Sequence, residues 1–181
     1  MTLPVPRRVL AVSGSLRARS INTAALLAAQ ALAPAGIEVT LFPGVGDLPH
    51  FNPDLDTPVP PAPVAAWRTA VAGADCLLFS TPEYAHGLPG AFKNALDWLV
   101  SFEGFVAKPV AIIAARPGGD HAQAALREIL TVMNARLLAG ACVTLPLTTN
   151  THDVAALLGQ PAVRGGLGAC LQSIAGHLRP S

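Results

Sequence analysis

Short runs of consecutive apolar residues alternate along this chain with segments of helical periodicity. The apolar runs predict five buried strands, at residues 8–13, 37–42, 75–80, 109–115 and 141–145. The segments between and after them predict helices at residues 21–33, 64–72, 89–102, 120–138 and 164–178. Strands that are apolar throughout, rather than at alternate positions, are typical of a parallel sheet covered on both faces.

This alternation predicts an α/β fold of three layers, in which a doubly wound parallel sheet of five strands lies between helices. A chain of 181 residues fits the flavodoxin-like strand order 2-1-3-4-5 better than the six-stranded order of dinucleotide-binding folds. No repeat or linker divides the sequence, so we expect residues 1–181 to form one domain. The proline-rich stretch at residues 43–63 is too long for an ordinary connection, and we interpret it as a functional loop or part of a subunit contact.

Composition and charge exclude several classes of function. The 12 Lys and Arg nearly balance the 11 Asp and Glu, whereas a general nucleic-acid binder needs a basic surface to meet phosphates. Although 51% of the residues are hydrophobic, no apolar run approaches the roughly 20 residues that span a bilayer. Ser13 and Gly14 interrupt the first apolar run, which we therefore interpret as a strand and not a secretory signal. We expect a soluble, cytoplasmic protein that binds neither nucleic acid nor membrane.

Two further features of the composition bear on partners and metals. Only 13% of the residues are charged, which favours a surface partly covered by another subunit. The three cysteines are an odd number without C-x-x-C spacing, so no disulfide framework or zinc site is indicated. The five histidines form neither H-x-H nor H-E-x-x-H, and we expect no metal site.

Candidate chemistry begins at the end of the first strand, because a doubly wound sheet binds ligands beyond the carboxyl ends of its strands. The segment GSLRARSIN at residues 14–22 leads from that strand into a helix. It offers backbone N–H groups at the helix start, the hydroxyls of Ser15 and Ser20, the amide of Asn22 and the guanidinium of Arg17. These donors favour a phosphate site; the alternative is a plain strand–helix turn in which Ser20 is only the N-cap.

The same loop narrows the class of phosphate ligand. It contains neither G-x-x-x-x-G-K-[ST] nor G-x-G-x-x-G, which excludes the NTPase cradle and the dinucleotide turn. It also lacks the G-x-S-x-G of a hydrolase nucleophile. Hydroxyls with one arginine suit a terminal phosphate dianion, and flavin mononucleotide (FMN) is the obvious cofactor of that kind in this architecture.

A second loop follows the third strand, where TPEYAHGLPG at residues 81–90 precedes AFKNALDWL at residues 91–99. The pattern Ser-Gly-Ser-Leu-Arg-x-x-Ser-x-Asn, followed by Pro-Glu-Tyr-x-x-x-x-Pro-Gly-x-x-Lys-Asn-Ala-x-Asp-Trp, resembles the NADPH-dependent FMN reductase family. That family includes bacterial quinone, chromate and azo-dye reductases of flavodoxin-like fold. The resemblance runs from Arg8 to about Leu147 and includes the segment DLPHFNPDL at residues 47–55.

The resemblance implies FMN and NADPH as cofactors and assigns residues to them. The binders of the FMN phosphate and ribityl chain would be Ser15, Leu16, Arg17, Ser20, Ile21 and Asn22. The flavin ring would lie against Pro82, Glu83 and Tyr84, and the loop at residues 115–119, with Gly118, would close its other side.

Two positions depart from the family pattern. Ala85 stands where the family commonly has asparagine, which removes one side-chain contact to the flavin. Arg116 stands where the family often has a small residue, and would meet the NADPH phosphate or a flavin edge, or remain a solvated loop arginine. The motif residues Lys93, Asn94, Asp97 and Trp98 are interpreted as structural or subunit-packing residues.

The activity that the resemblance implies is an NAD(P)H-dependent flavin oxidoreductase that reduces flavin, quinones or similar small acceptors by a ping-pong mechanism. The hydride chemistry belongs to the flavin, so no catalytic side chain is assigned. Flavin sites in this family lie near a dimer contact, which implies a homodimer or homotetramer. Two alternatives stay open: an FMN-binding electron carrier that does not oxidise NADPH directly, and a reductase that releases reduced FMN to a partner oxygenase.

Overall fold

A single parallel sheet forms the middle of the protein, whose computed structural model describes residues 5–148 and 153–179. Its strands are β1 (Arg7–Ser13), β2 (Ile37–Leu41), β3 (Cys76–Ser80), β4 (Pro109–Ala114), β5 (Arg136–Leu137) and β6 (Val143–Thr144). The strand order is β2-β1-β3-β4-β5, and β6 also pairs with β4. This confirms the expected flavodoxin-like order.

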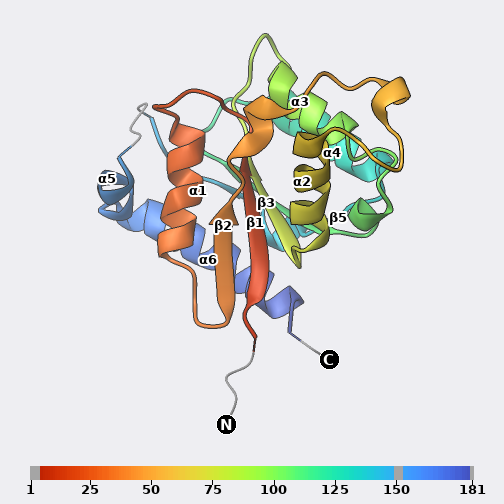
Figure 1. Ribbon diagram of the computed structural model, residues 1–181. Coiled ribbons are helices and arrows are strands. Elements are labelled where there is room, and N and C mark those ends of the chain that lie inside the picture. Colours follow the sequence, from red (N-terminus) through yellow and green to blue (C-terminus); the bar gives the residue numbers. More distant parts are fainter. Residues whose placement is uncertain (1–4, 149–152, 180–181) are drawn as a thin grey trace.

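Helices cover both faces of the sheet (Figure 1). One face carries α1 (Ile21–Ala31), α5 (Val154–Leu158) and α6 (Pro161–His177). The other carries α2 (Ala62–Ala72), α3 (Gly90–Asp97) and α4 (Asp120–Val132). Within β1 the side chains alternate between the two layers: Val9 and Ala11 pack on the first face, Leu10 and Val12 on the second. The central strands β1, β3 and β4 therefore carry runs of consecutive buried residues, as their sequence indicates, whereas the edge strand β2 has exposed Glu38 and Thr40.

The fifth strand is the main correction to the expected elements. In place of one strand at residues 141–145, two strands of two residues each, β5 and β6, pair with β4 at successive positions. The helix expected at residues 120–138 ends at Val132, because Asn134 adopts a left-handed backbone conformation with φ of 57°. Residues that follow are thereby free to turn back and pair as β5.

Smaller differences occur at other helices. The helix expected at residues 89–102 ends at Asp97, and a short 3₁₀ turn, η3 (Glu103–Phe105), follows. Helix α2 begins two residues earlier than expected, with prolines at its start, where a missing N–H is harmless. Helix α5 was not expected from the sequence; the carboxylate of Asp153 caps it by accepting from the Ala155 N–H at 2.9 Å.

The proline-rich stretch at residues 43–63 folds into two 3₁₀ turns, η1 (Gly44–Asp47) and η2 (Pro53–Leu55), and is fastened to α3. Asn94 accepts the Phe51 N–H through Oδ1 at 2.7 Å and donates through Nδ2 to the Pro49 carbonyl at 2.9 Å. The Trp98 Nε1–H donates to the same carbonyl at 2.8 Å. Asn94 and Trp98 thus have the structural role expected of them, and the stretch they hold is ordered against the helical layer.

Candidate cofactor pocket

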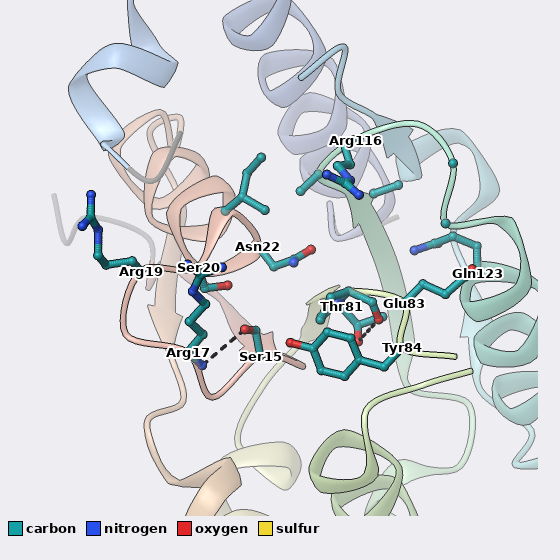
Figure 2. Close-up of a pocket in the computed structure, with 16 residues that line it drawn as sticks. Ser15, Arg17, Arg19, Ser20, Asn22, Thr81, Glu83, Tyr84, Arg116 and Gln123 are labelled. Atoms are coloured by element: carbon teal, nitrogen blue, oxygen red, sulfur yellow. Dashed lines mark hydrogen bonds between the residues drawn. The ribbon is translucent and has the colours of Figure 1, made fainter. Parts of the chain in front are cut away.

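A cavity of about 360 Å³ opens at the carboxyl ends of β1, β3 and β4. Its size lies at the lower end of the range for small-molecule sites, roughly 300–1,000 Å³. Three segments form its walls: the β1–α1 loop, the β3–α3 loop and the β4–α4 loop (Figure 2). The cavity therefore occupies the position where a doubly wound sheet binds its ligand.

The first wall is built by hydroxyl groups that fix the β1–α1 loop. Ser13 accepts the Ser15 N–H through Oγ at 3.2 Å and lies 2.8 Å from the Thr23 hydroxyl. The Ser15 hydroxyl in turn accepts the Arg17 N–H at 3.3 Å (Figure 2). These hydrogen bonds fix the conformation of the loop that precedes α1. Ser20 caps α1 by accepting the Thr23 N–H at 3.3 Å. The sequence-based interpretation of Ser20 as an N-cap is therefore confirmed.

Asn22 connects this wall to the neighbouring strand. Its side chain is buried, and its Oδ1 accepts the hydroxyl of Ser80, at the end of β3, at 3.0 Å. The bond fixes the orientation of the amide and leaves Nδ2 as the group of Asn22 that a ligand can use.

The second wall is the loop after β3, which ends in a tight turn. Tyr84 and Gly87 exchange two backbone hydrogen bonds, at 3.0 and 2.9 Å. Between them Ala85 and His86 both have positive φ, at 48° and 60°, as in a type I′ turn. The turn leaves the Tyr84 ring 55% exposed beside the cavity, where it is available to cover a planar ligand (Figure 2).

The electrostatics of the cavity favour an anion. Three arginines line it, Arg17, Arg19 and Arg116, and all are exposed at its rim. Glu83 is the one acidic residue in the lining, among the described residues, and its carboxylate is engaged by the Ala122 N–H of α4 at 2.8 Å. Guanidinium groups, hydroxyls and free N–H groups are a donor set that suits a phosphate. The residues present therefore fit FMN, with its terminal phosphate on the β1–α1 side.

Of the twelve site residues predicted from the sequence, ten line this cavity: Ser15, Arg17, Ser20, Ile21, Asn22, Pro82, Glu83, Tyr84, Arg116 and Gly118. Leu16 and Ala85 do not. The side chain of Leu16 instead lies over η1, at 3.3 Å from the position that a Cβ at Gly46 would occupy. Ala85 lies at the exposed tip of the turn, so an asparagine there would serve the positive φ of the turn as well as any ligand.

Six lining residues were not among the twelve: Arg19, Thr81, Ala114, Ala115, Gly119 and Gln123. Four of them lie in the three loop segments that the sequence indicated, whereas Ala114 at the end of β4 and Gln123 on the first turns of α4 lie outside these segments. Gln123 belongs to no recognisable motif. Only its place one turn into α4, beside the third loop, could have indicated that it lines the cavity. No group of three or more His, Cys, Asp or Glu side chains in the described ranges is arranged to hold a metal ion. No helix in those ranges has the length and apolar character needed to cross a bilayer.

The fold is flavodoxin-like, and its cavity is lined by groups that suit a phosphorylated ligand. Residues 7–150 match the NADPH-dependent FMN reductase family, and the chain belongs to that family. Its members are oxidoreductases that use FMN and NAD(P)H. This confirms the family, the class of enzyme and the cofactors that the two motifs indicated.

Individual relatives agree with this assignment. The chain is 36% identical to an NAD(P)H-dependent FMN reductase of Pseudomonas aeruginosa over 151 residues, which are 81% of each protein. It is 34% identical to a quinone reductase of Escherichia coli over 137 residues, 72% of this chain and 73% of the relative. Among solved structures, it is similar to a flavoenzyme NAD(P)H:acceptor oxidoreductase from Paracoccus denitrificans. The TM-score is 0.71 and the identity 28%, with 94% of this chain and 98% of the other covered.

Proposed function

We propose that this protein is an NAD(P)H-dependent reductase that binds FMN in the cavity between its three loops and reduces flavin, quinones or similar small acceptors. One observation carries the proposal: the two sequence motifs, which begin at Ser13 and Pro82, meet in one cavity. That cavity is lined with hydrogen-bond donors that suit a phosphate. Residues 1–181 would form one FMN-binding domain, in a soluble, cytoplasmic homodimer or homotetramer.

When bound, FMN accepts a hydride from NAD(P)H and passes two electrons to the acceptor. The chain's own task is to bind and orient. Ser15, Arg17 and Ser20 hold the phosphate, and Asn22 the ribityl chain. Pro82 and Tyr84 cover the ring, and Gly118 brings backbone close to its other side. The exposed Arg116 binds the phosphate of NADPH. NAD(P)H and the acceptor would use this one cavity in turn, so we expect ping-pong kinetics, with parallel double-reciprocal plots.

The visible spectrum of the purified full chain, before and after anaerobic NADPH, tests this proposal. A yellow protein that bleaches with NADPH supports it. A yellow protein that does not bleach identifies the electron carrier instead. A colourless protein that consumes NADPH only when FMN is added identifies FMN as a released substrate. A colourless protein that remains inert with FMN present overturns the reductase assignment.

The site assignment has a separate test in Arg17→Gln, which removes the guanidinium beside the predicted phosphate position. Because a hydrogen bond to a charged group contributes about 1.5–3 kcal/mol, FMN should bind roughly 10- to 100-fold more weakly. Riboflavin lacks the phosphate, so its affinity should be unchanged. Arg164→Gln, on an exposed position of α6, is the matched control. Equal loss of FMN and riboflavin affinity would place the phosphate elsewhere.

A further inference from the structure

The N-terminus of helix α4 is capped by a side chain from a distant loop. Its N-cap residue, Gly119, has no side chain with which to satisfy the first N–H groups of the helix. The N–H of Ala122, the third residue of α4, donates instead to Glu83 Oε2 at 2.8 Å, across 39 positions of sequence. A carboxylate at this end of a helix is also favoured by the helix dipole.

This contact joins two walls of the cofactor pocket. Glu83 belongs to the loop after β3, whereas residues 115–119 and the start of α4 form the third wall. Figure 2 shows the Glu83 side chain extending from beside Tyr84 toward Gln123 of α4. A second contact supports the same junction: the rings of His86 and His121 stack with centroids 4.1 Å apart and planes at 17°. The β4–α4 loop itself is mostly exposed, and Gly118 has a φ of +87°, so the loop depends on this junction for its position.

Glu83 also contributes charge. It is the single acidic residue lining the cavity in the described ranges, and it faces the side opposite the arginine-rich β1–α1 loop. A negative charge near a flavin disfavours the gain of electrons by its ring, so a carboxylate in this wall would lower the reduction potential of a flavin bound in the cavity.

We propose that Glu83 is a positioning residue with two separable effects, an inference that rests on the proposed binding of FMN. Its hydrogen bond to Ala122 holds the β4–α4 loop where it closes on the flavin. Its charge sets how readily that flavin is reduced. The side chain would thus act on the third wall of the cavity, through its bond to α4, in addition to any contact that the Glu83 backbone makes.

Two variants of the full chain distinguish the effect of the Glu83 hydrogen bond from the effect of its charge. Glu83→Gln keeps an acceptor oxygen for the Ala122 N–H but removes the charge. Glu83→Ala removes both. Glu128→Ala, which truncates an exposed glutamate on the same helix, is the control. Three quantities are measured for each: amide hydrogen exchange of residues 118–123 without FMN, the dissociation constant of FMN, and the reduction potential of the bound flavin.

We expect Glu83→Ala to accelerate exchange at Ala122 and weaken FMN binding roughly five- to tenfold, the effect of losing a helix cap. Glu83→Gln should retain slow exchange and bind FMN within about twofold of the wild type, yet show a more positive potential. The control should match the wild type in all three. Exchange at Ala122 that is unchanged in Glu83→Ala overturns the positioning role, and an unchanged potential in Glu83→Gln overturns the electrostatic role.

Failure of this inference is distinguishable from failure of the proposed function. A wild-type chain that does not bind FMN at all contradicts the proposed function, while the exchange measurement still decides whether Glu83 holds α4. Circular dichroism establishes that each variant is folded. If Glu83→Ala does not fold, Glu83→Gln alone decides the effect of charge, and loss of slow exchange in that variant contradicts the role of the hydrogen bond.

Discussion

At the scale of single residues, the pocket depends on how closely two loops approach each other at Gly14. The Gly14 N–H donates to the Ser80 carbonyl at 2.8 Å, which brings the backbone against buried Thr81. A Cβ on Gly14 would lie 2.2 Å from Thr81 Oγ1 and 2.6 Å from Thr81 Cβ. Glycine is therefore required here by contact between the first and second walls, beyond any requirement of the phosphate.

Gly14→Ala should consequently force the two loops apart. We expect it to lower the free energy of unfolding by about 1–3 kcal/mol, as overpacking does, and to weaken FMN binding. The control is Gly165→Ala in α6, where a Cβ would meet nothing within 4 Å. That change should stabilise the protein by about 0.5–1 kcal/mol, because alanine favours helix. Urea unfolding of both variants checks the pair, and a Gly14→Ala protein as stable as the wild type would contradict the packing argument.

A second residue, Ala85, is held in a conformation that its side chain disfavours. Its φ of 48° places it in the left-handed region at the first central position of the Tyr84–Gly87 turn. Ala85→Gly should therefore stabilise the protein by about 1 kcal/mol. The same substitution at exposed, helical Ala124 should destabilise it by about the same amount. Thermal unfolding measures both changes; a shift of the same sign in the two variants would show that the turn is not strained.

At the scale of elements, strands and helices are predicted well where apolar runs and turn residues both mark their ends. They are predicted poorly where the conformation of a single residue determines where an element ends. The apolar runs predict β1 to β4, and the chain length favours the strand order that the structure has. The fifth strand is divided by a 3₁₀ turn, η4 (Ala139–Ala141), and β5 begins soon after Asn134, whose left-handed conformation follows the end of α4. Asparagine is a known C-terminal signal for helices, but the apolar periodicity continues past it and favours a longer helix. Likewise, the two motifs predict most of the pocket, whereas Gln123 is found only once α4 is placed beside β4.

The proline-rich segment at residues 43–63 is an element held by side chains more than by backbone pairing. Arg68 of α2 binds the Asp56 carboxylate at 2.9 Å, donates to the Trp98 carbonyl at 2.8 Å and packs against the Phe102 ring. Ser101 donates a hydrogen bond to the same carboxylate. The Ser101 hydroxyl and then the Arg68 guanidinium lower the pKa of Asp56, against the opposing effect of burial.

Because its pKa is lowered, the contribution of Asp56 to the stability of the protein should depend on pH. Because the carboxyl is more acidic in the folded state, its contribution is complete above the unfolded value of about 4 and is lost as the pH falls through the lower folded value. Asp56→Asn should cost about 1 kcal/mol at neutral pH, the order expected for a surface network. The difference from wild type should shrink below about pH 4. Denaturant unfolding of the wild type and of Asp56→Asn at neutral and at low pH measures this difference. A difference that persists unchanged at low pH would contradict the ion pair.

At the scale of the whole molecule, we expect the two apolar layers on either side of the sheet to unfold together, and two buried thiols can report that event. Cys76 of β3 and Cys170 of α6 belong to the same layer, with exposed fractions of 0% and 2%. Burial raises the pKa of both thiols to about 12. They are therefore protonated and shielded in the folded protein, and a thiol reagent reaches them only after the layer has opened. Cys142, beside β6, is partly exposed and serves as the internal reference.

Labelling with a thiol reagent should thus link the pocket to the stability of the entire fold. The proposed FMN site is built from residues at the carboxyl ends of β1, β3 and β4, so we expect FMN to bind only the folded chain. At a concentration 100 times its dissociation constant it stabilises that state by about 2.7 kcal/mol. Modification of Cys76 and Cys170 should then slow roughly 100-fold, while Cys142 reacts at its former rate. Peptide mass mapping resolves the three sites. Buried thiols that react as fast as Cys142 would indicate that the helical layers open independently, and rates insensitive to FMN would mean that the cofactor does not select the folded state.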